Sequence, residues 1–253
     1  MKTIWITGGA SGIGFATAKK FIDNNWRVII SSRNEEKLKI AKNNILSFNT
    51  KANIYYLTCD ISNREKVHKT VKKIENEIAP IDIALLNAAS YSPNKSQGFD
   101  IKDYELLIDV NLKGTLYCIE ILKNVMQVRK KGYIAIVSSP VGYRGLPTAG
   151  AYGLTKAGLI NLAESLYFDF KKENIKVSVI NPGFIKSDST KLNSFPMPFL
   201  KSADFAANNI FNGLTKHRKF EIYFPWFFLK LLKIGRILPY NIYFFLIRKI
   251  TRL

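Results

Sequence analysis

Residues 3–21 read Thr-Ile-Trp-Ile-Thr-Gly-Gly-Ala-Ser-Gly-Ile-Gly-Phe-Ala-Thr-Ala-Lys-Lys-Phe. A short β-rich apolar run is followed by clustered glycines and then by apolar side chains at helical spacing, which predicts a strand, a tight turn and a helix. Backbone N–H groups of such a turn, together with the positive end of the helix, bind a pyrophosphate, and glycines allow its close approach. The residues expected to form this phosphate loop are Gly8, Ser11, Gly12, Ile13 and Gly14.

Five further strand-like runs lie along the chain, and helical patterns fill the intervals between them. These runs are residues 27–31, 53–58, 81–87, 133–138 and 176–180. Strands that alternate with helices need crossover connections, so the pattern predicts an α/β fold with a Rossmann-type, doubly wound parallel sheet. Ligands of such a sheet bind at the carboxyl ends of its strands.

The chain shows no repeat, low-complexity tract or internal linker, which predicts one dinucleotide-binding domain over residues 1–215 that includes the catalytic site. Residues 216–253 differ, because nine lysines and arginines accompany a single acidic residue, Glu221, among many aromatic side chains. Cations interrupt every apolar stretch before the ~18 residues that a membrane span needs. Two alternatives stay open: this extension packs on the domain over the active site or a subunit interface, or it lies in the plane of an anionic membrane surface.

Composition excludes several classes of protein. The only cysteines, Cys59 and Cys118, lie far apart, and no Cys/His cluster has metal-ligand spacing, so we expect neither disulfides nor a metal site. The amino terminus enters a strand without a secretory signal, which favours the cytoplasm, with membrane association left open by the extension. The net charge of +19 is spread over many lysines, a pattern typical of solvated helix faces, and without an aromatic RNA-binding motif no nucleic-acid partner is expected.

The end of the second predicted strand carries Ser31-Ser32-Arg33, where an acidic residue would accept hydrogen bonds from the ribose of NAD. No carboxylate stands there. The guanidinium of Arg33 matches a 2′-phosphate in shape and charge, and Ser32 can donate a further hydrogen bond. The sequence therefore favours NADP(H) over NAD(H), the alternative being that Arg33 is a solvated loop residue.

A second group of residues is Tyr152-Gly-Leu-Thr-Lys156, which lies within a helical pattern. Four-residue spacing places both side chains on one helix face. A free tyrosine titrates near pH ~10, and a neighbouring ammonium favours the phenolate and lowers the pKa. Such a pair is common by chance, so its meaning depends on the residues around it.

Ser139 directly follows the strand expected at 133–138 and lies thirteen positions before Tyr152. Asn181-Pro-Gly183 follows the strand expected at 176–180. With the phosphate loop and Tyr-x-x-x-Lys in this order, the sequence resembles the short-chain dehydrogenase/reductase superfamily over about residues 1–190. The resemblance implies that Tyr152 donates or accepts the proton, that Lys156 holds the nicotinamide ribose and lowers the tyrosine pKa, and that Ser139 hydrogen-bonds the substrate oxygen. It also implies that Asn111 anchors a water of the proton relay.

The same resemblance assigns further cofactor contacts. Asp60, followed by Ile61, corresponds to the residue that contacts the adenine, and Asn87 with Ala88 begins the motif beneath the cofactor. The residues expected around the nicotinamide are Pro182, Gly183 and Ile185, with Ser187 at the position usually held by threonine.

The sequence departs from the family pattern at two positions. Ala89 stands at the usual glycine of the Asn-Asn-Ala-Gly stretch, where its side chain would shift the loop that borders the active site. Pro140 follows the catalytic serine and removes a backbone donor there.

The predicted activity is hydride transfer between NADP(H) and a carbonyl or alcohol, on a lipophilic substrate because the loop at 184–200 and the extension are apolar. That loop reads as a lid rather than a packed helix. Two alternatives remain: a 3-oxoacyl carrier reductase, and a nucleotide-binding regulatory protein with little catalysis. The resemblance also implies a homodimer or homotetramer assembled through the helices expected at 102–128 and 151–171.

Overall fold

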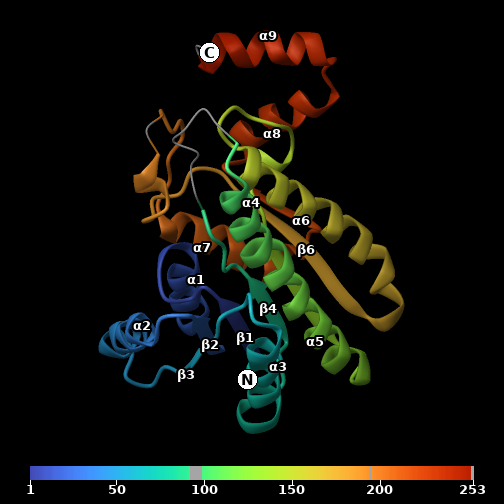
Figure 1. The fold of residues 1–253 in the computed structure, drawn as a ribbon. Helices are drawn as coiled ribbons and strands as arrows, with labels where there is room; N and C mark the ends of the chain where they lie inside the picture. Colours follow the sequence, from blue (N-terminus) through green and yellow to red (C-terminus); the bar gives the residue numbers. More distant parts are fainter. Residues whose placement is uncertain (92–98, 194, 252–253) are drawn as a thin grey trace.

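A computed structural model describes residues 1–91, 99–193 and 195–251. The strands are β1 (Thr3–Thr7), β2 (Arg27–Ser32), β3 (Ile54–Thr58), β4 (Ile83–Leu86), β5 (Gly132–Val137), β6 (Ile175–Pro182) and β7 (Glu221–Phe224). The α-helices are α1 (Gly12–Ile22), α2 (Glu35–Phe48), α3 (Arg64–Lys73), α4 (Ile101–Leu107), α5 (Gly114–Val128), α6 (Gly150–Asp169), α7 (Ala203–Asn212), α8 (Trp226–Ile234) and α9 (Tyr240–Thr251). Strands and helices alternate through most of the chain, as the sequence predicts (Figure 1).

All seven strands form one parallel sheet with the order β3-β2-β1-β4-β5-β6-β7. The chain winds outward from β1 in one direction to β3, then returns to the other side of β1 with β4. The connections that leave β1 and β4 therefore diverge, and this reversal of strand order creates a crevice at the carboxyl ends of the two strands. The predicted doubly wound fold is confirmed.

Side-chain alternation along the strands builds a core on each face of the sheet. On β1, Trp5 faces the core formed with α3, α5 and α6, whereas its neighbours Ile4 and Ile6 face the core formed with α1, α2 and α7. Figure 1 shows α5 and α6 on one side of the sheet and α1 and α2 on the other. Because both faces are covered, the central strands are apolar along their whole length rather than alternating with polar residues.

The helices begin and continue as local chemistry dictates. Asn34 and Asn63 accept hydrogen bonds from the backbone N–H groups of Lys37 and Lys66, which caps α2 and α3 directly after the strands that precede them. The long helix expected at 102–128 is formed by α4, a π-helical turn at Ile108–Lys113 and α5. A π-helical turn has one residue more per turn than an α-helix, and such turns are often found at functional sites.

The structure contains one strand that the sequence pattern does not predict, β7. β7 pairs in parallel with β6, so the sheet domain extends beyond residue 215 to at least Phe224. The strand is only four residues long and follows the cationic stretch at 216–219, so its alternation is too short to stand out. Ser194 of the expected lid, and Arg252 and Leu253 of the extension, lie outside the described residues.

The segment at 184–200 contains no α-helix in its described residues, and one 3₁₀ turn, Thr190–Leu192, lies within it. After β7 the chain forms α8 against the sheet domain, and α9 lies beyond α8 at one end of the molecule (Figure 1). None of the helices formed by residues 1–91, 99–193 and 195–251 has the length and apolar character needed to span a membrane.

Candidate active site

The phosphate loop connects β1 to α1 as predicted, and its glycines are required by the backbone. Gly8 and Gly12 have φ angles of +67° and +54°, which side chains rarely tolerate. A Cβ on Gly14 would lie 2.3 Å from the carbonyl oxygen of Gly8. The first turn of α1 has no acidic residue, and Ser11 makes no side-chain cap there, so the helix end suits an anion. This cradle fits the pyrophosphate of a dinucleotide.

The loop after β4 is tied to the phosphate loop through Asn87 and Thr7. The side-chain amide of Asn87 donates to the carbonyl oxygens of Thr7 at 3.0 Å and Gly8 at 3.3 Å. In return, the Thr7 hydroxyl accepts from the N–H groups of Asn87 and Ala88, both at 3.0 Å. Ala89 has no positive φ, so the backbone tolerates a side chain at the usual glycine position.

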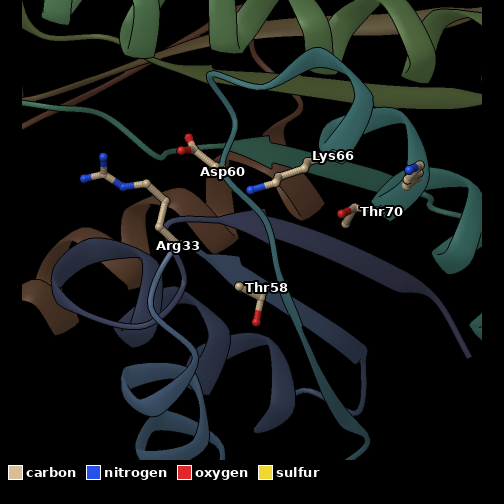
Figure 2. Close-up of a pocket in the computed structure, with 6 residues that line it drawn as sticks. Arg33, Thr58, Asp60, Lys66 and Thr70 are labelled. Carbon is tan, nitrogen blue, oxygen red and sulfur yellow. The ribbon is translucent and has the colours of Figure 1, made fainter.

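A pocket of about 380 Å³ opens beside the ends of β2 and β3, and its lining residues are Arg33, Thr58, Asp60, Lys66, Lys69 and Thr70. Arg33 comes from the loop after β2, whereas the two lysines come from the first turns of α3 (Figure 2). Ser32 lies at the end of β2, and its hydroxyl donates to the carbonyl oxygen of Asn34 at 3.2 Å. The pocket is therefore lined by three cationic side chains and one carboxylate.

The carboxylate of Asp60 is held by Ser62, whose N–H and hydroxyl donate to it at 3.1 and 2.8 Å. The side chain of Ile61 instead packs in the core beneath Gly114, so a ligand can meet only its backbone. The many lysines of the sequence are typical of solvated helix faces, and that pattern does not predict that Lys66 and Lys69 line this pocket. Their i, i+3 spacing directly after β3 was the available signal, because β3 neighbours β2 in a doubly wound sheet.

Ser139, Tyr152 and Lys156 come together where β5 ends and α6 begins. The Nζ atom of Lys156 lies 5.5 Å from the centre of the Tyr152 ring, so the predicted shared helix face is confirmed. Tyr152 and Ser139 are partly exposed and hydrogen-bonded to each other, whereas Lys156 is buried beneath them. The Ser138 hydroxyl donates to the carbonyl oxygen of Lys156 at 2.7 Å, which fixes α6 against the end of β5.

Pro140 fits the turn that follows the catalytic serine. It begins a short 3₁₀ helix, Pro140–Gly142, where a missing N–H leaves no unsatisfied hydrogen bond. The Ser139 hydroxyl accepts from the N–H of Val141 at 3.4 Å and caps that turn. The proline is therefore compatible with the serine's position.

The electrostatics of the pair differ from the expectation. Burial raises the pKa of Tyr152, the nearby Tyr91 phenol raises it further, and the hydrogen bond with Ser139 opposes both. The depression expected from Lys156 is absent in the chain alone, because the Lys156 Nζ donates to the carbonyl oxygen of Val137 at 3.0 Å rather than to the phenol. Burial lowers the pKa of Lys156 to about 8.

Asn111 lies in the π-helical turn and is fully engaged. Its side-chain oxygen accepts from the N–H of Ser90 at 2.7 Å, and its amide donates to the Ser90 carbonyl oxygen at 3.0 Å and to Thr155 Oγ1 at 3.2 Å. Thr155 in turn donates to the carbonyl oxygen of Tyr152. Asn111 thus joins the loop after β4 to the helix that carries Tyr152, and its expected role with a water stays a prediction.

The loop after β6 returns to the phosphate loop. Gly183 follows Pro182, the last residue of β6, and its N–H donates to the carbonyl oxygen of Phe224 at 2.8 Å. Ile185 points into the core, so its side chain supports the loop from below. The Cβ of Ser187 would lie 3.6 Å from a Cβ on Gly12, which places the two loops side by side. The loops after β1, β4, β5 and β6 thus surround one site.

Two further features of the site are not predicted from the sequence. The Tyr91 ring packs edge-on against the Tyr152 ring, with centres 4.9 Å apart, and its hydroxyl donates to Asn193 of the expected lid. Nothing in the local pattern marks a tyrosine five residues after β4 as part of the site. Only the tertiary structure brings Tyr91 to Tyr152.

The second missed feature joins the site to the carboxyl-terminal helices. Tyr143, from the loop after Ser139, donates to Glu221 at 2.5 Å, and the Asn181 amide donates to the same oxygen at 2.9 Å. Lys233 of α8 pairs with the other Glu221 oxygen. Burial and the neighbouring Glu221 carboxylate raise the pKa of Tyr143. The one acidic residue of the extension therefore fastens α8 to the sheet and to the active-site loop.

Within the described ranges, no group of three or more His, Cys, Asp or Glu side chains is arranged to hold a metal ion. Cys59 and Cys118 are free and buried.

Comparison with known proteins places this site in context. The model of the short chain dehydrogenase family matches residues 2–195, the part of the chain that contains every proposed site residue. A 3-oxoacyl-[acyl-carrier-protein] reductase of Rickettsia typhi is 37% identical over 194 residues, which is 76% of each chain.

Other similarities extend further along the chain. An uncharacterized oxidoreductase of Myxococcus xanthus is 26% identical over 238 residues, 94% of this chain and 93% of its own, so the alignment must include part of the carboxyl-terminal segment. Among solved structures, ElxO with NADP bound is 27% identical, has a TM-score of 0.77 and covers 88% of this chain and 97% of its own.

Proposed function

This chain belongs to the short-chain dehydrogenase/reductase family and is an oxidoreductase of that family, and on this premise we propose that it reduces a ketone or aldehyde with NADPH. The observation that carries the proposal is the position of Ser139 and Tyr152. Both side chains reach solvent at the end of β5, beside the crevice that the phosphate loop and Asn87 border. A carbonyl group bound there would lie beside the hydroxyl groups of Ser139 and Tyr152 and next to the loops that would bind the dinucleotide.

In the proposed mechanism, the phosphate loop and Asn87 would hold the dinucleotide, which when bound would supply a hydride to the carbonyl carbon. The hydroxyl groups of Ser139 and Tyr152 hydrogen-bond the carbonyl oxygen and orient it. As negative charge develops on that oxygen, the Tyr152 phenol transfers its proton to it. The carbonyl has then gained one hydride and one proton, and the product is the alcohol.

The remaining residues hold this arrangement. Lys156 would contact the nicotinamide ribose, and Asn111 keeps the loop after β4 aligned with α6 through Ser90 and Thr155. The raised pKa of Tyr152 keeps the phenol protonated at neutral pH in the chain alone, so its proton is present for transfer to the carbonyl oxygen.

The proposal is tested with a panel of ketones and aldehydes of increasing chain length, run in parallel with NADPH and NADH. We expect oxidation of NADPH that depends on the carbonyl and rises with the apolar length of the substrate, because Phe184, Phe195 and Phe199 line the loop beside the site. Tight NADPH binding without turnover on any carbonyl would instead support the regulatory alternative.

A carrier-linked substrate is the second candidate, and the Rickettsia typhi relative favours it by name and by 37% identity. The same panel discriminates, because a carrier reductase prefers a 3-oxoacyl carrier protein to the free acyl thioester. An equal rate on both forms would favour the free lipophilic carbonyl.

Preference for NADPH is proposed to come from Arg33 together with Lys66 and Lys69. We expect Arg33→Ala to weaken NADPH binding about 10- to 100-fold, since a hydrogen bond to a charged group contributes about 1.5–3 kcal/mol, and to leave NADH binding nearly unchanged. Calorimetric titration with each dinucleotide measures the two effects. Lys171→Ala, which removes an exposed cation far from the pocket, is the matched control. Equal losses for both dinucleotides would contradict the assignment.

Assembly as a dimer or tetramer is also proposed, through the long helices. Large apolar side chains are exposed along them: Leu106, Leu116, Leu154, Tyr167 and Phe168. Exposed large apolar side chains on these helices are what supports assembly there.

A further inference from the structure

The helix α8 is apolar on two opposite sides, although only one side packs on the domain. On the inner side, Leu229 is fully buried and Phe228 contacts the rings of Phe184 and Phe199. The outer side carries large apolar side chains that are half-exposed or more, and they are Trp226, Phe227, Leu231 and Ile234. A helix with one packed side ordinarily carries polar side chains on the opposite side. The outer face of α8 therefore needs something to cover it.

Further large apolar side chains are exposed beyond α8. Ile237, between the two helices, is 82% exposed. On α9, Ile242, Leu246 and Ile250 follow each other at four-residue spacing and are all exposed, so they form one apolar ridge. Trp226 at the start of α8 is 64% exposed. We call these eight exposed apolar residues and the four cations among them the α8–α9 surface: Trp226, Phe227, Leu231, Ile234, Ile237, the ridge of α9, Lys230, Arg236, Arg248 and Lys249.

The α8–α9 surface is firmly attached to the rest of the molecule. The Arg144 guanidinium donates to the carbonyl oxygens of Gly235 and Leu238 and lies 4.1 Å from the centre of the Tyr243 ring. The Tyr243 hydroxyl donates back to the carbonyl oxygen of Gly145 at 2.7 Å. On α8 the exposed side chains thus project from a helix whose opposite side, with Phe228 and Leu229, is already packed, and they cannot turn inward without breaking these contacts. On α9 the contacts with the domain pass through Tyr243, the one buried side chain of that helix among the described residues.

The charge on this surface has one sign. Residues 222–251 contain no Asp or Glu, and Lys230, Arg236, Arg248 and Lys249 are exposed. Glu221, the only acidic residue of the segment, is already engaged by Lys233, Tyr143 and Asn181. An occupant must therefore offer negative charge and an apolar phase together.

We infer that the α8–α9 surface docks on an anionic lipid bilayer, with the aromatic and aliphatic side chains in the headgroup boundary and the cations against anionic lipid. A second copy of the chain would bring the same uncompensated positive charge to the interface, which disfavours self-association there. Docking through the outer side of α8 would bring the loop at 184–200 to within about one helix diameter of the membrane, because Phe199 of that loop packs on Phe228 on the inner side of α8.

The test is co-sedimentation of the full chain with vesicles of phosphatidylcholine alone or with one third phosphatidylglycerol, so it needs no enzymatic activity. We expect binding to the anionic vesicles that weakens as salt is raised. Phe227→Glu with Leu231→Glu should lower the partition at least tenfold, because two side chains lose their burial in the headgroup boundary. The matched control is Ile40→Glu with Phe48→Glu, on the remote α2 helix, where Phe48 is 80% exposed. It should bind as the wild type does.

A second pair of variants isolates the charge. Arg248→Gln with Lys249→Gln should lower the partition about twentyfold, since each cation near an anionic surface contributes about fivefold. Lys171→Gln with Lys172→Gln removes two adjacent exposed cations elsewhere and should change the partition little. If both control pairs weaken binding as much as the α8–α9 pairs, general positive charge rather than this surface binds the lipid, and the inference is wrong. It is also wrong if the wild type ignores anionic vesicles, or if Phe227→Glu with Leu231→Glu instead converts a dimer to a monomer in light scattering.

Discussion

Turnover of Tyr152→Phe is expected to fall about 100- to 10,000-fold, with NADPH binding close to that of the wild type. The phenol hydroxyl is the only group removed, and it is the proposed proton donor. The ring itself stays, so its edge-on contact with Tyr91 and the packing of α6 are kept. NADPH oxidation with the best carbonyl of the panel measures the rate, and fluorescence titration measures dinucleotide binding.

Tyr167→Phe is the matched control, because it removes a hydroxyl from the same helix, where the ring packs against Phe168 and Phe220 instead of bordering the crevice. It should keep the wild-type rate. If Tyr152→Phe also kept that rate, the proton would have to come from another group, and the proposed mechanism would be wrong.

The two directions of the reaction should also differ in their response to pH. Burial holds the Tyr152 phenol in its protonated form across neutral pH, so the supply of protons for reduction is constant there. Oxidation of an alcohol needs the phenolate, whose population increases with pH up to and beyond the ordinary tyrosine pKa.

Much of the fold follows from the sequence because it is written in local patterns. The strand at Thr3–Thr7 and the glycines after it are adjacent in the chain, and both the apolar period and the turn chemistry agree there. Once the strands are known to be parallel, the ends of β1, β4, β5 and β6 must meet at one edge. This topology agrees with the resemblance to the family, which implies Asn87, Ser139 and Gly183 for the site that Gly12 borders.

The missed features depend on contacts between distant segments. Glu221 is one charged residue in a cationic stretch, and its role appears only when β7 joins the sheet and brings it to Tyr143. The lowered pKa expected for Tyr152 was wrong for the chain alone for a related reason. Helical spacing places Lys156 near the ring, but the carbonyl oxygen of Val137, across the sequence on β5, takes its hydrogen bond.

Lys156 carries the largest electrostatic cost among the proposed site residues. It is buried, and burial lowers its pKa from 10.5 to about 8. The charged ammonium is therefore less stable in the folded chain than in water, by on the order of 3 kcal/mol at pH 7. Proteins retain such strain where function needs the group, and its removal should raise stability while it harms activity.

We therefore expect Lys156→Met to raise the free energy of unfolding by about 1–2 kcal/mol at pH 7 and to abolish most NADPH turnover. The gain is smaller than the full electrostatic cost because the Val137 carbonyl oxygen loses its donor. Denaturant unfolding measures the first effect and NADPH oxidation the second. Lys171→Met, at an exposed position, should change neither.

The pH dependence of the free energy of unfolding tests separately whether the buried ammonium of Lys156 destabilises the folded chain. Between pH 8 and 10.5 the unfolded chain holds the Lys156 proton more tightly than the folded chain. Because stability rises with pH wherever the unfolded state binds more protons, the wild type should gain stability over this range through Lys156. Lys156→Met lacks that gain, so its advantage should be largest below pH 8 and shrink as pH rises towards 10.5. If the stability advantage of Lys156→Met stayed constant with pH, removal of the buried ammonium would not be the cause of that advantage. Packing of the methionine side chain would then be the cause.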